Sequence, residues 1–238
     1  MSKKKKYITL SLLITFSVYC SLTIGQSTDE QYHLLQGKIT LDYLFSLGRI
    51  DKNIAYGEYY STIYWSFLYF ITEIFPFKYQ TQVNHVVNLI FSLSVVFGIG
   101  KVGTELFNKK VGKIIFIILF FYPIFFGHMS FNGKDMFLAF CHVWIFYLVI
   151  RYFKKQNIKD KANNYVITLG ILTALGASIH LTFLGSLIPV FLFILIEIYF
   201  LKKFINSKFS KKKFFTDSIK VFFIFYFVLV IFWIDTHQ

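Results

Sequence analysis

The sequence is short of charge, of cysteine and of arginine. Only 16% of its 238 residues are charged and 56% are apolar, whereas soluble domains average about 25% charged residues. This composition excludes a water-soluble fold. Both cysteines, Cys20 and Cys141, lie inside apolar runs, which excludes a disulfide scaffold. Arginine occurs only at positions 49 and 151, so lysine supplies nearly all of the basic side chains behind the formal net charge of +13.

The lysines are segregated between apolar segments. This segregation argues against nucleic acid as a partner, although the net charge is strongly positive. The lysine runs at 3–6 and 211–213 are typical of residues that fix the topology of a membrane protein and contact the anionic headgroups of membrane lipids. Membrane lipids are therefore the expected surroundings of the chain.

Several charge-free windows are long enough to cross a membrane, because a helix of about 20 residues spans a hydrocarbon core of about 30 Å. The stretch 162–196 is too long for one crossing, and its Gly176, Gly185 and Pro189 predict two helices that meet near 178–185. We predict an all-α polytopic membrane protein with a single domain, 1–238, and about seven transmembrane helices. The expected spans are 7–25, 83–101, 113–129, 136–152, 164–181, 184–201 and 216–234.

The distribution of lysine predicts the orientation of these spans. With the amino terminus in the cytoplasm, 20 of the 25 basic residues lie on the cytoplasmic side. Tyr7–Ile24 is longer than the apolar core of a usual signal peptide and is interpreted as an uncleaved span. The first external loop, about 26–82, is then large, and its aromatic segment Tyr59–Phe75 is expected to form a juxtamembrane helix at the outer interface. The expected location is the cytoplasmic (inner) membrane.

Acidic residues and histidines gather on the external side of this topology. Eight of the twelve acidic residues and five of the six histidines fall there. The five histidines are His33, His85, His128, His180 and His237. Any chemistry is therefore expected at the external face.

The first candidate cluster, Asp29-Glu30 with Tyr32 and His33, directly follows the first span. A carboxylate in this place is either a solvated loop residue or a general base at the membrane surface. Partial desolvation would raise its pKa and its basicity. The spacing of the residues leaves both interpretations open.

Two further clusters lie in short external segments. The turn 127–135 holds His128, Asn132, Lys134 and Asp135. Lys134 is suited to holding a phosphate as a point charge, and Asp135 is a candidate N-cap of the next helix. His180 lies in the expected break of the 162–196 stretch, where broken helices line cavities or are buried in protein. It is either a structural histidine or a ligand contact.

These segments follow one another in the order of a known family. In order, they are the acidic pair Asp29-Glu30, the aromatic segment Glu58–Trp65, the cytoplasmic turn Glu105–Lys110, the dipeptide Tyr122-Pro123, the turn Asn132–Asp135 and the element Ser178–His180. Residues 1 to about 200 resemble the GT-C membrane glycosyltransferases, in the branch of the dolichyl-phosphate-mannose-protein mannosyltransferases and the lipid A aminoarabinose transferases. The chain departs from that branch at Tyr32 and His180, where arginine and lysine are usual.

The resemblance implies an enzyme that moves a hexose or pentose from a polyprenyl-phosphate donor to a lipid or protein acceptor at the outer face. Its implied catalytic residues are Asp29, Glu30 and Asp135. Asp29 would accept the proton of the acceptor, and Glu30 or Asp135 would position the acceptor or a divalent cation, the one cofactor the family suggests. The implied substrate-binding residues are His33, Tyr59, Tyr60, His128, Asn132, Lys134 and His180.

Two other interpretations stay open. A secondary transporter also has broken helices, but its ionisable residues lie near the middle of the membrane. A non-catalytic relative of the transferases would give no product. Members of the family usually continue beyond the seventh span, so we expect the chain to be truncated at its carboxyl terminus.

Overall fold

The structure is a computed structural model of the chain, and it describes residues 3–49 and 63–232. Within these two ranges every regular element is helical and no strand occurs, which confirms the predicted all-α class. The helices are α1 (Lys3–Thr23), α2 (Thr28–Phe45), α3 (Ile63–Thr72), η1 (Phe77–Tyr79), α4 (Gln80–Leu106), α5 (Lys109–Phe120), α6 (Pro123–His128), α7 (Gly133–Lys155), α8 (Lys159–Ile179), α9 (Thr182–Ser186), α10 (Ile188–Ile196), the π-helical turn η2 (Glu197–Leu201) and α11 (Lys211–Phe232).

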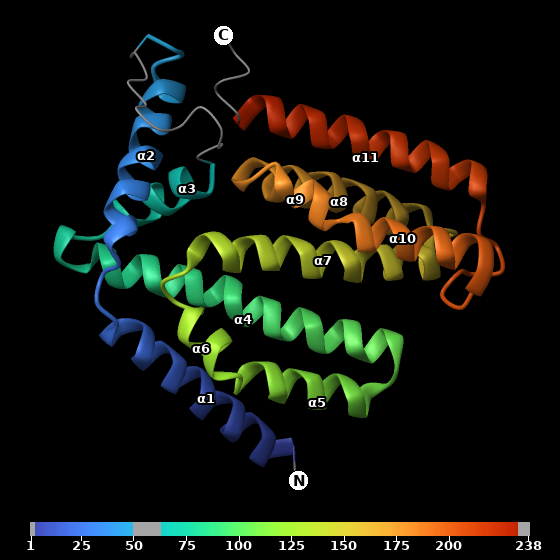
Figure 1. Cartoon of the computed structure of the whole chain (residues 1–238), viewed down its shortest axis with the longest axis horizontal. Coiled ribbons are helices and arrows are strands. Elements are labelled where there is room, and N and C mark those ends of the chain that lie inside the picture. Colours follow the sequence, from blue (N-terminus) through green and yellow to red (C-terminus); the bar gives the residue numbers. More distant parts are fainter. Residues whose placement is uncertain (1–2, 50–62, 233–238) are drawn as a thin grey trace.

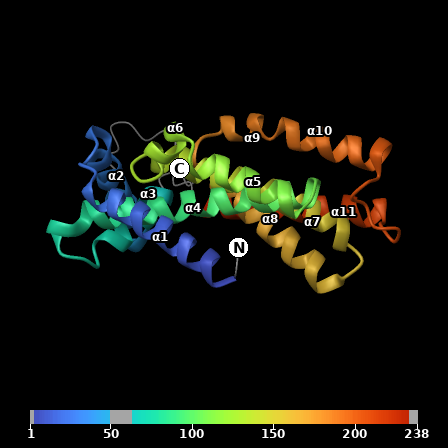
Figure 2. The ribbon, with the colours of Figure 1, turned by 90° about the horizontal axis from the view of Figure 1, so that it is seen from below.

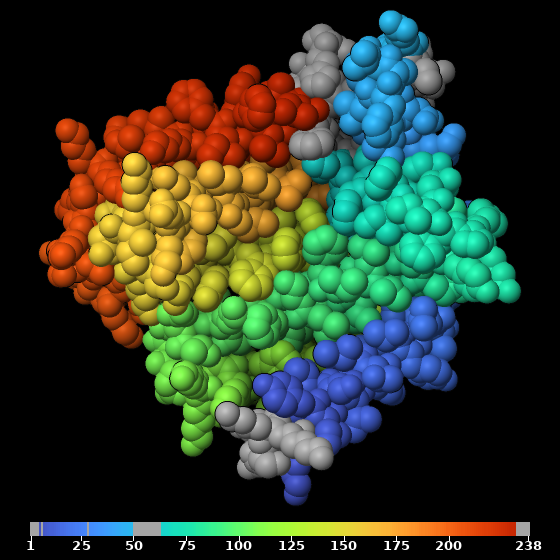
Figure 3. All heavy atoms as spheres, turned by 180° about the vertical axis from the view of Figure 1, so that it is seen from behind, coloured from blue at the N-terminus to red at the C-terminus, as the bar shows by residue number. Residues whose placement is uncertain are grey.

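The long helices lie side by side in the order α4, α7, α8 and α11, with α1 and α5 packed on α4 (Figure 1). The middle of the bundle is α7. Its buried positions Phe137, Cys141, Ile145, Val149 and Phe153 recur every four residues, so they form one stripe along the helix. Seen from behind, α11 runs along the outer edge of the bundle beside α8 (Figure 3).

Among the residues that the structure describes, five helical segments are long and apolar enough to cross a membrane. They are Phe77–Leu106, Gly133–Lys155, Lys159–Ile179, Thr182–Leu201 and Lys211–Ile231. The apolar part of α1, Tyr7–Thr23, is shorter than these segments. The length and composition of the five helices give the protein the character of a multi-pass membrane protein, but the expected count of seven spans is not confirmed.

The predicted span 113–129 is broken in the structure. The helix α5 has 12 residues, about 18 Å, and ends at Phe120. Tyr122 is extended, with φ −70° and ψ 114°, and Pro123 begins the short helix α6. A proline disfavours helical geometry at the residue before it and lacks the N–H that would continue the helix. The charge-free window was long enough for a span, but its proline divides it.

The predicted break in 162–196 is confirmed. The helix α8 ends at Ile179, and His180 is extended before α9 begins. Gly176 contributes through packing, because a Cβ at this position would overlap the ring of Phe183, which folds back from α9 onto α8. Pro189 lies in the first turn of α10, where proline fits a helix.

The bundle has two chemically different ends (Figure 1). We call the first the lysine end; it contains the loops between α4 and α5, between α7 and α8, and between η2 and α11, and it holds most of the basic residues. We call the second the histidine end; it contains the α1–α2 junction, the start of α4, the α6–α7 turn and the α8–α9 break, and it holds His33, His85, His128 and His180.

Candidate functional site

The two adjacent acids at the α1–α2 junction face different surroundings. Asp29 and Glu30 both lie in the first turn of α2, where the partial positive charge of the helix start favours carboxylates. Asp29 is exposed, whereas Glu30 is only 5% exposed. Successive residues of a helix point about 100° apart, which explains how neighbours come to face solvent and protein. Only Asp29 is therefore open to a solute.

Glu30 forms a buried pair with His85. Its Oε1 lies 2.8 Å from Nε2 of His85, whose Nδ1 lies 3.3 Å from the carbonyl oxygen of Ser21. The two contacts give both ring nitrogens of His85 a partner, and Glu30 gains a buried partner that offsets part of the cost of burying a carboxyl group. The pair joins α1, α2 and α4.

The polar face of α4 continues from His85 toward the middle of the helix. The hydroxyl of Tyr64 in α3 donates to Oδ1 of Asn88, and the hydroxyl of Ser92 donates to the carbonyl of Met129 at 2.8 Å. A Cβ at Gly133 would lie 2.6 Å from Oδ1 of Asn88, so glycine allows the start of α7 to approach α4 here. These contacts fix α3 and the α6–α7 turn on α4.

His33 brings the first and second predicted clusters together. Its ring stacks on Trp65 of α3, with the centroids 4.2 Å apart and the planes at 3°. Burial lowers the pKa of His33 below its ordinary value, while the charge of Asp29 raises this pKa and the charge of Lys134 lowers it further. Asp29 and Lys134, at the first turns of α2 and α7, therefore act on the same imidazole.

The α6–α7 turn is organised by Asn132. Its Oδ1 accepts the N–H of Asp135 at 3.4 Å, and its Nδ2 donates to Oδ2 of Asp135 at 2.9 Å. The same Nδ2 lies 3.3 Å from Nδ1 of His128. The expectation of Asp135 as the N-cap is wrong, because Asn132 caps α7 and Asp135 lies in the first turn. The Asp135 side chain remains exposed.

His180 lies at the histidine end, as predicted, between the end of α8 and the start of α9. Its Nδ1 accepts the backbone N–H of Thr182 at 3.2 Å and lies 2.6 Å from the hydroxyl of Thr182. These contacts hold the break between α8 and α9. Tyr59 and Tyr60, the other predicted substrate contacts, lie outside the described residues.

The predicted divalent cation finds no preformed set of ligands in residues 3–49 and 63–232, where no group of three or more His, Cys, Asp or Glu side chains is arranged to hold a metal ion. In particular, Glu30 is engaged with His85 and does not face Asp135 across an open space. The catalytic roles of Asp29, Glu30 and Asp135 stay predictions.

An apolar groove of about 470 Å³ runs beside this polar cluster. Its walls come from α2, α3, α4 and α7 and include Leu41, Tyr64, Phe67, Phe91 and Phe137. Tyr64 and its neighbour Ser66 flank Trp65, which stacks on His33, and Phe137 follows Lys134 by one helical turn. The groove therefore lies close to the charged residues of the histidine end, and its apolar walls are suited to contact with an apolar chain.

His85 and Asn88 are the residues of this region that were not singled out from the sequence. Their signal is visible in hindsight, because Asn84, His85, Asn88 and Ser92 recur at helical spacing inside an otherwise apolar helix. Polar residues in such a position pack on partners within the protein. The sequence does not indicate which partners these are.

Comparison of the chain with models of known protein families, with curated proteins and with solved structures finds no match.

Proposed function

We propose that the protein is a membrane glycosyltransferase that moves a sugar from a polyprenyl-phosphate donor to a lipid or protein acceptor at the histidine end. The observation that carries the proposal is that the sequence neighbours of the exposed Asp29 and the cationic Lys134, which are Glu30 and Gly133, pack on adjacent turns of α4, at His85 and Asn88. A carboxylate and a cation in one place are what this reaction needs. The resemblance of the sequence to the GT-C enzymes supplies the reaction type.

In the proposed step, a hydroxyl of the acceptor attacks the anomeric carbon of the sugar. A bond forms between that carbon and the acceptor oxygen, and the bond from the carbon to the phosphate oxygen breaks. Asp29 accepts the proton of the hydroxyl, and the polyprenyl phosphate leaves with the electron pair. Lys134 balances the charge that develops on the phosphate. His33, whose ring stacks on Trp65, belongs to the same polar cluster.

The apolar groove supports a lipid-linked donor. Its walls are apolar side chains of α2, α3, α4 and α7, and it adjoins the polar cluster through Tyr64 and Phe137. A polyprenyl chain in this groove would bring its phosphate toward Lys134. A water-soluble nucleotide sugar has no apolar chain that this groove could bury.

The direct test replaces Asp29 by Asn and measures transfer of a radiolabelled hexose or pentose from polyprenyl phosphate in membranes. Loss of a general base lowers the rate by about 100-fold to 10,000-fold. Asp42→Asn is the matched control, because Asp42 also lies on α2 but pairs with Lys38 at 3.5 Å. Near-normal transfer by the Asp29→Asn variant contradicts the proposal.

A secondary transporter is the second candidate, and the buried Glu30–His85 pair favours it because buried ionisable pairs serve proton-coupled transport. The pair nevertheless lies near one end of α4, since His85 is only five residues, about 7.5 Å, beyond Gln80. Transporter sites lie near the midplane of the membrane. The position of His85 therefore favours the transferase.

Labelling with a membrane-impermeant maleimide separates the two candidates and tests the orientation. In a Cys20→Ser background, Asp29→Cys and Asp135→Cys should react quickly when reagent is added outside intact cells, and Lys109→Cys should react only after lysis. We propose on the lysine distribution that the lysine end is cytoplasmic. Failure of positions 29 and 135 to react from either side would favour the transporter.

A further inference from the structure

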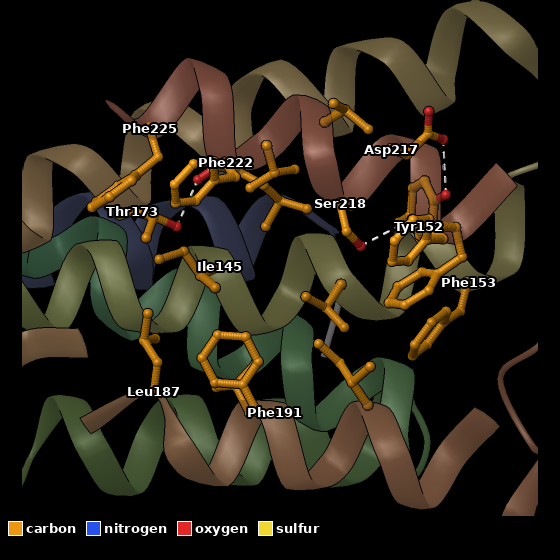
Figure 4. A pocket seen from close by; sticks show the side chains of 18 of the residues that line it. Ile145, Tyr152, Phe153, Thr173, Leu187, Phe191, Asp217, Ser218, Phe222 and Phe225 are labelled. Carbon is orange, nitrogen blue, oxygen red and sulfur yellow. Dashed lines mark hydrogen bonds between the residues drawn. The ribbon is translucent and has the colours of Figure 1, made fainter. Parts of the chain in front are cut away.

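A second apolar cavity, of about 710 Å³, lies between α7, α8, α10 and α11 (Figure 4). Its size falls within the range of about 300–1,000 Å³ typical of ligand pockets. Ile145, Leu187, Phe191 and Phe222 are among its lining residues. It shares only α7 and α8 with the groove at the histidine end, which Leu175 of α8 also lines.

The cavity exists because α10 stands away from the rest of the bundle. Figure 2 shows α9 and α10 along one edge of the molecule and α8 along the other. The contact of α10 with α7 runs through long side chains, such as the rings of Phe146 and Phe193 with centroids 5.0 Å apart. On the other side of the cavity, α11 packs on α8.

Each polar side chain that lines the cavity has a hydrogen-bond partner within the protein. The Tyr152 hydroxyl donates to Oδ2 of Asp217 at 2.9 Å, and the Ser218 hydroxyl donates to the carbonyl of Phe214 at 2.9 Å. The Thr173 hydroxyl donates to the carbonyl of Leu169 at 2.8 Å. The interior therefore suits a hydrocarbon chain better than a polar ligand.

The lysine end of the cavity is strongly basic. Seven lysines lie between positions 202 and 220; three of them are in the segment that connects η2 to α11, and four are in the first half of α11. Nζ of Lys211 lies 4.7 Å from the centre of the Tyr199 ring, so the start of α11 meets η2 here. Lys212 is exposed, and Lys220 is half-exposed with its Nζ 3.4 Å from Oδ1 of Asp217.

We propose that this cavity binds an anionic phospholipid from the membrane leaflet at the lysine end. Its acyl chain lies among the side chains of α7, α10 and α11, and its phosphate contacts Lys211 and Lys212 at the start of α11. Each lysine near an anionic lipid surface favours binding. A second copy of the chain is a poorer occupant, because it would bring the same seven lysines to the same place. The proposal is independent of the transferase activity.

The test compares two lipids with identical oleoyl chains, phosphatidylglycerol and phosphatidylcholine, by native mass spectrometry and by the melting temperature of the purified full chain. The variant K211Q/K212Q should bind phosphatidylglycerol at least about tenfold more weakly and lose the preference for it. K109Q/K110Q removes two exposed lysines from the same end, at α5, and should bind like the unaltered protein. Equal losses in the two variants would overturn the proposal.

A second pair of variants tests the acyl chain. Ser218 and Thr216 are both exposed on α11, and each hydroxyl donates to the carbonyl four residues earlier, but only Ser218 lines the cavity. Ser218→Phe should abolish the bound-lipid mass and the rise in melting temperature with both lipids, whereas Thr216→Phe should keep them. Unchanged lipid binding by Ser218→Phe, or a lipid-free dimer as the purified species, would overturn the proposal.

Discussion

Most acidic residues of the lysine end are buried or paired within the protein, with Asp160, exposed in the first turn of α8, as the exception, whereas two of those at the histidine end are exposed. At the lysine end, Glu105 accepts hydrogen bonds from Arg151 at 2.7 Å and from Lys154, and Asp217 accepts from Tyr152. At the histidine end, Asp29 and Asp135 are exposed in the first turns of their helices. Carboxylates that are already paired with cations connect helices, and few of their oxygen lone pairs remain to bind a solute. More carboxylates are therefore bound into contacts between helices at the lysine end, and more are accessible to solvent at the histidine end.

Glu30 is the informative exception at the histidine end. It is next to Asp29 in the sequence, yet it is buried and paired like the acids of the lysine end. The first turn of α2 thus combines a structural carboxylate with an accessible one. The buried pair holds the α1–α2 junction on α4, and the neighbouring residue remains available for chemistry.

The largest expected effect comes from breaking that pair. His85→Ala should lower the free energy of unfolding by about 3–5 kcal/mol, because Glu30 would remain buried without its partner. Denaturation in detergent micelles measures this loss. Glu30→Gln in the same background should restore part of it by removing the stranded carboxylate. A loss below about 1 kcal/mol for His85→Ala would mean that the pair does not hold the junction.

A smaller effect is expected from glycine substitutions that compare helix packing at the two ends. At Gly112, toward the lysine end, a Cβ would lie 2.5 Å from the carbonyl oxygen of Gly100, a backbone atom that cannot turn away. At Gly133 the neighbour is the side chain of Asn88, which can move. Gly112→Ala should therefore cost about 1–3 kcal/mol of unfolding free energy, and Gly133→Ala less. The reverse order in a denaturation series would contradict this packing.

The smallest effect is the pH dependence contributed by His33. Burial lowers the pKa of His33 in the folded state, so the folded protein binds fewer protons at this site than the unfolded chain does. Stability should consequently fall as the pH drops below about 6.5, the ordinary pKa of histidine. His33→Gln should reduce this dependence of the melting temperature on pH. An unchanged or steeper dependence would show that His33 does not contribute it.

The helical class and the break at His180 could be predicted because they follow from composition and from glycine and proline. The division of 113–129 at Pro123 could also have been predicted from the proline. The segment was interpreted as one span because it contains a long window without charged residues. The seven-span count depended on that window and on the shorter apolar part of α1. Hydropathy measures the length of a window and does not show where its helix is interrupted.

Only part of the candidate site could be predicted, because the order of the spans shows which residues lie at the same end of the bundle but not which way each side chain points. Topology alone places Asp29, His33 and Lys134 at one end, because they flank the same ends of consecutive spans. It does not give the rotation of a helix about its axis, which decides that Glu30 faces His85 while Asp29 faces outward. It also does not show that Asn132 rather than Asp135 caps α7.

The most direct test of the account is a cross-link between the first turns of α2 and α7. Glu30, next to Asp29, contacts His85 of α4, and Gly133, next to Lys134, packs on Asn88 one turn farther along α4, so the first turns of α2 and α7 lie against the same part of α4. In membranes, with Cys20 replaced by Ser, Asp29→Cys and Lys134→Cys should be joined by a short bismaleimide, and Asp29→Cys should not be joined to Lys109→Cys at the lysine end. Absence of the 29–134 cross-link under conditions that label both cysteines would contradict the convergence on which the proposed chemistry depends.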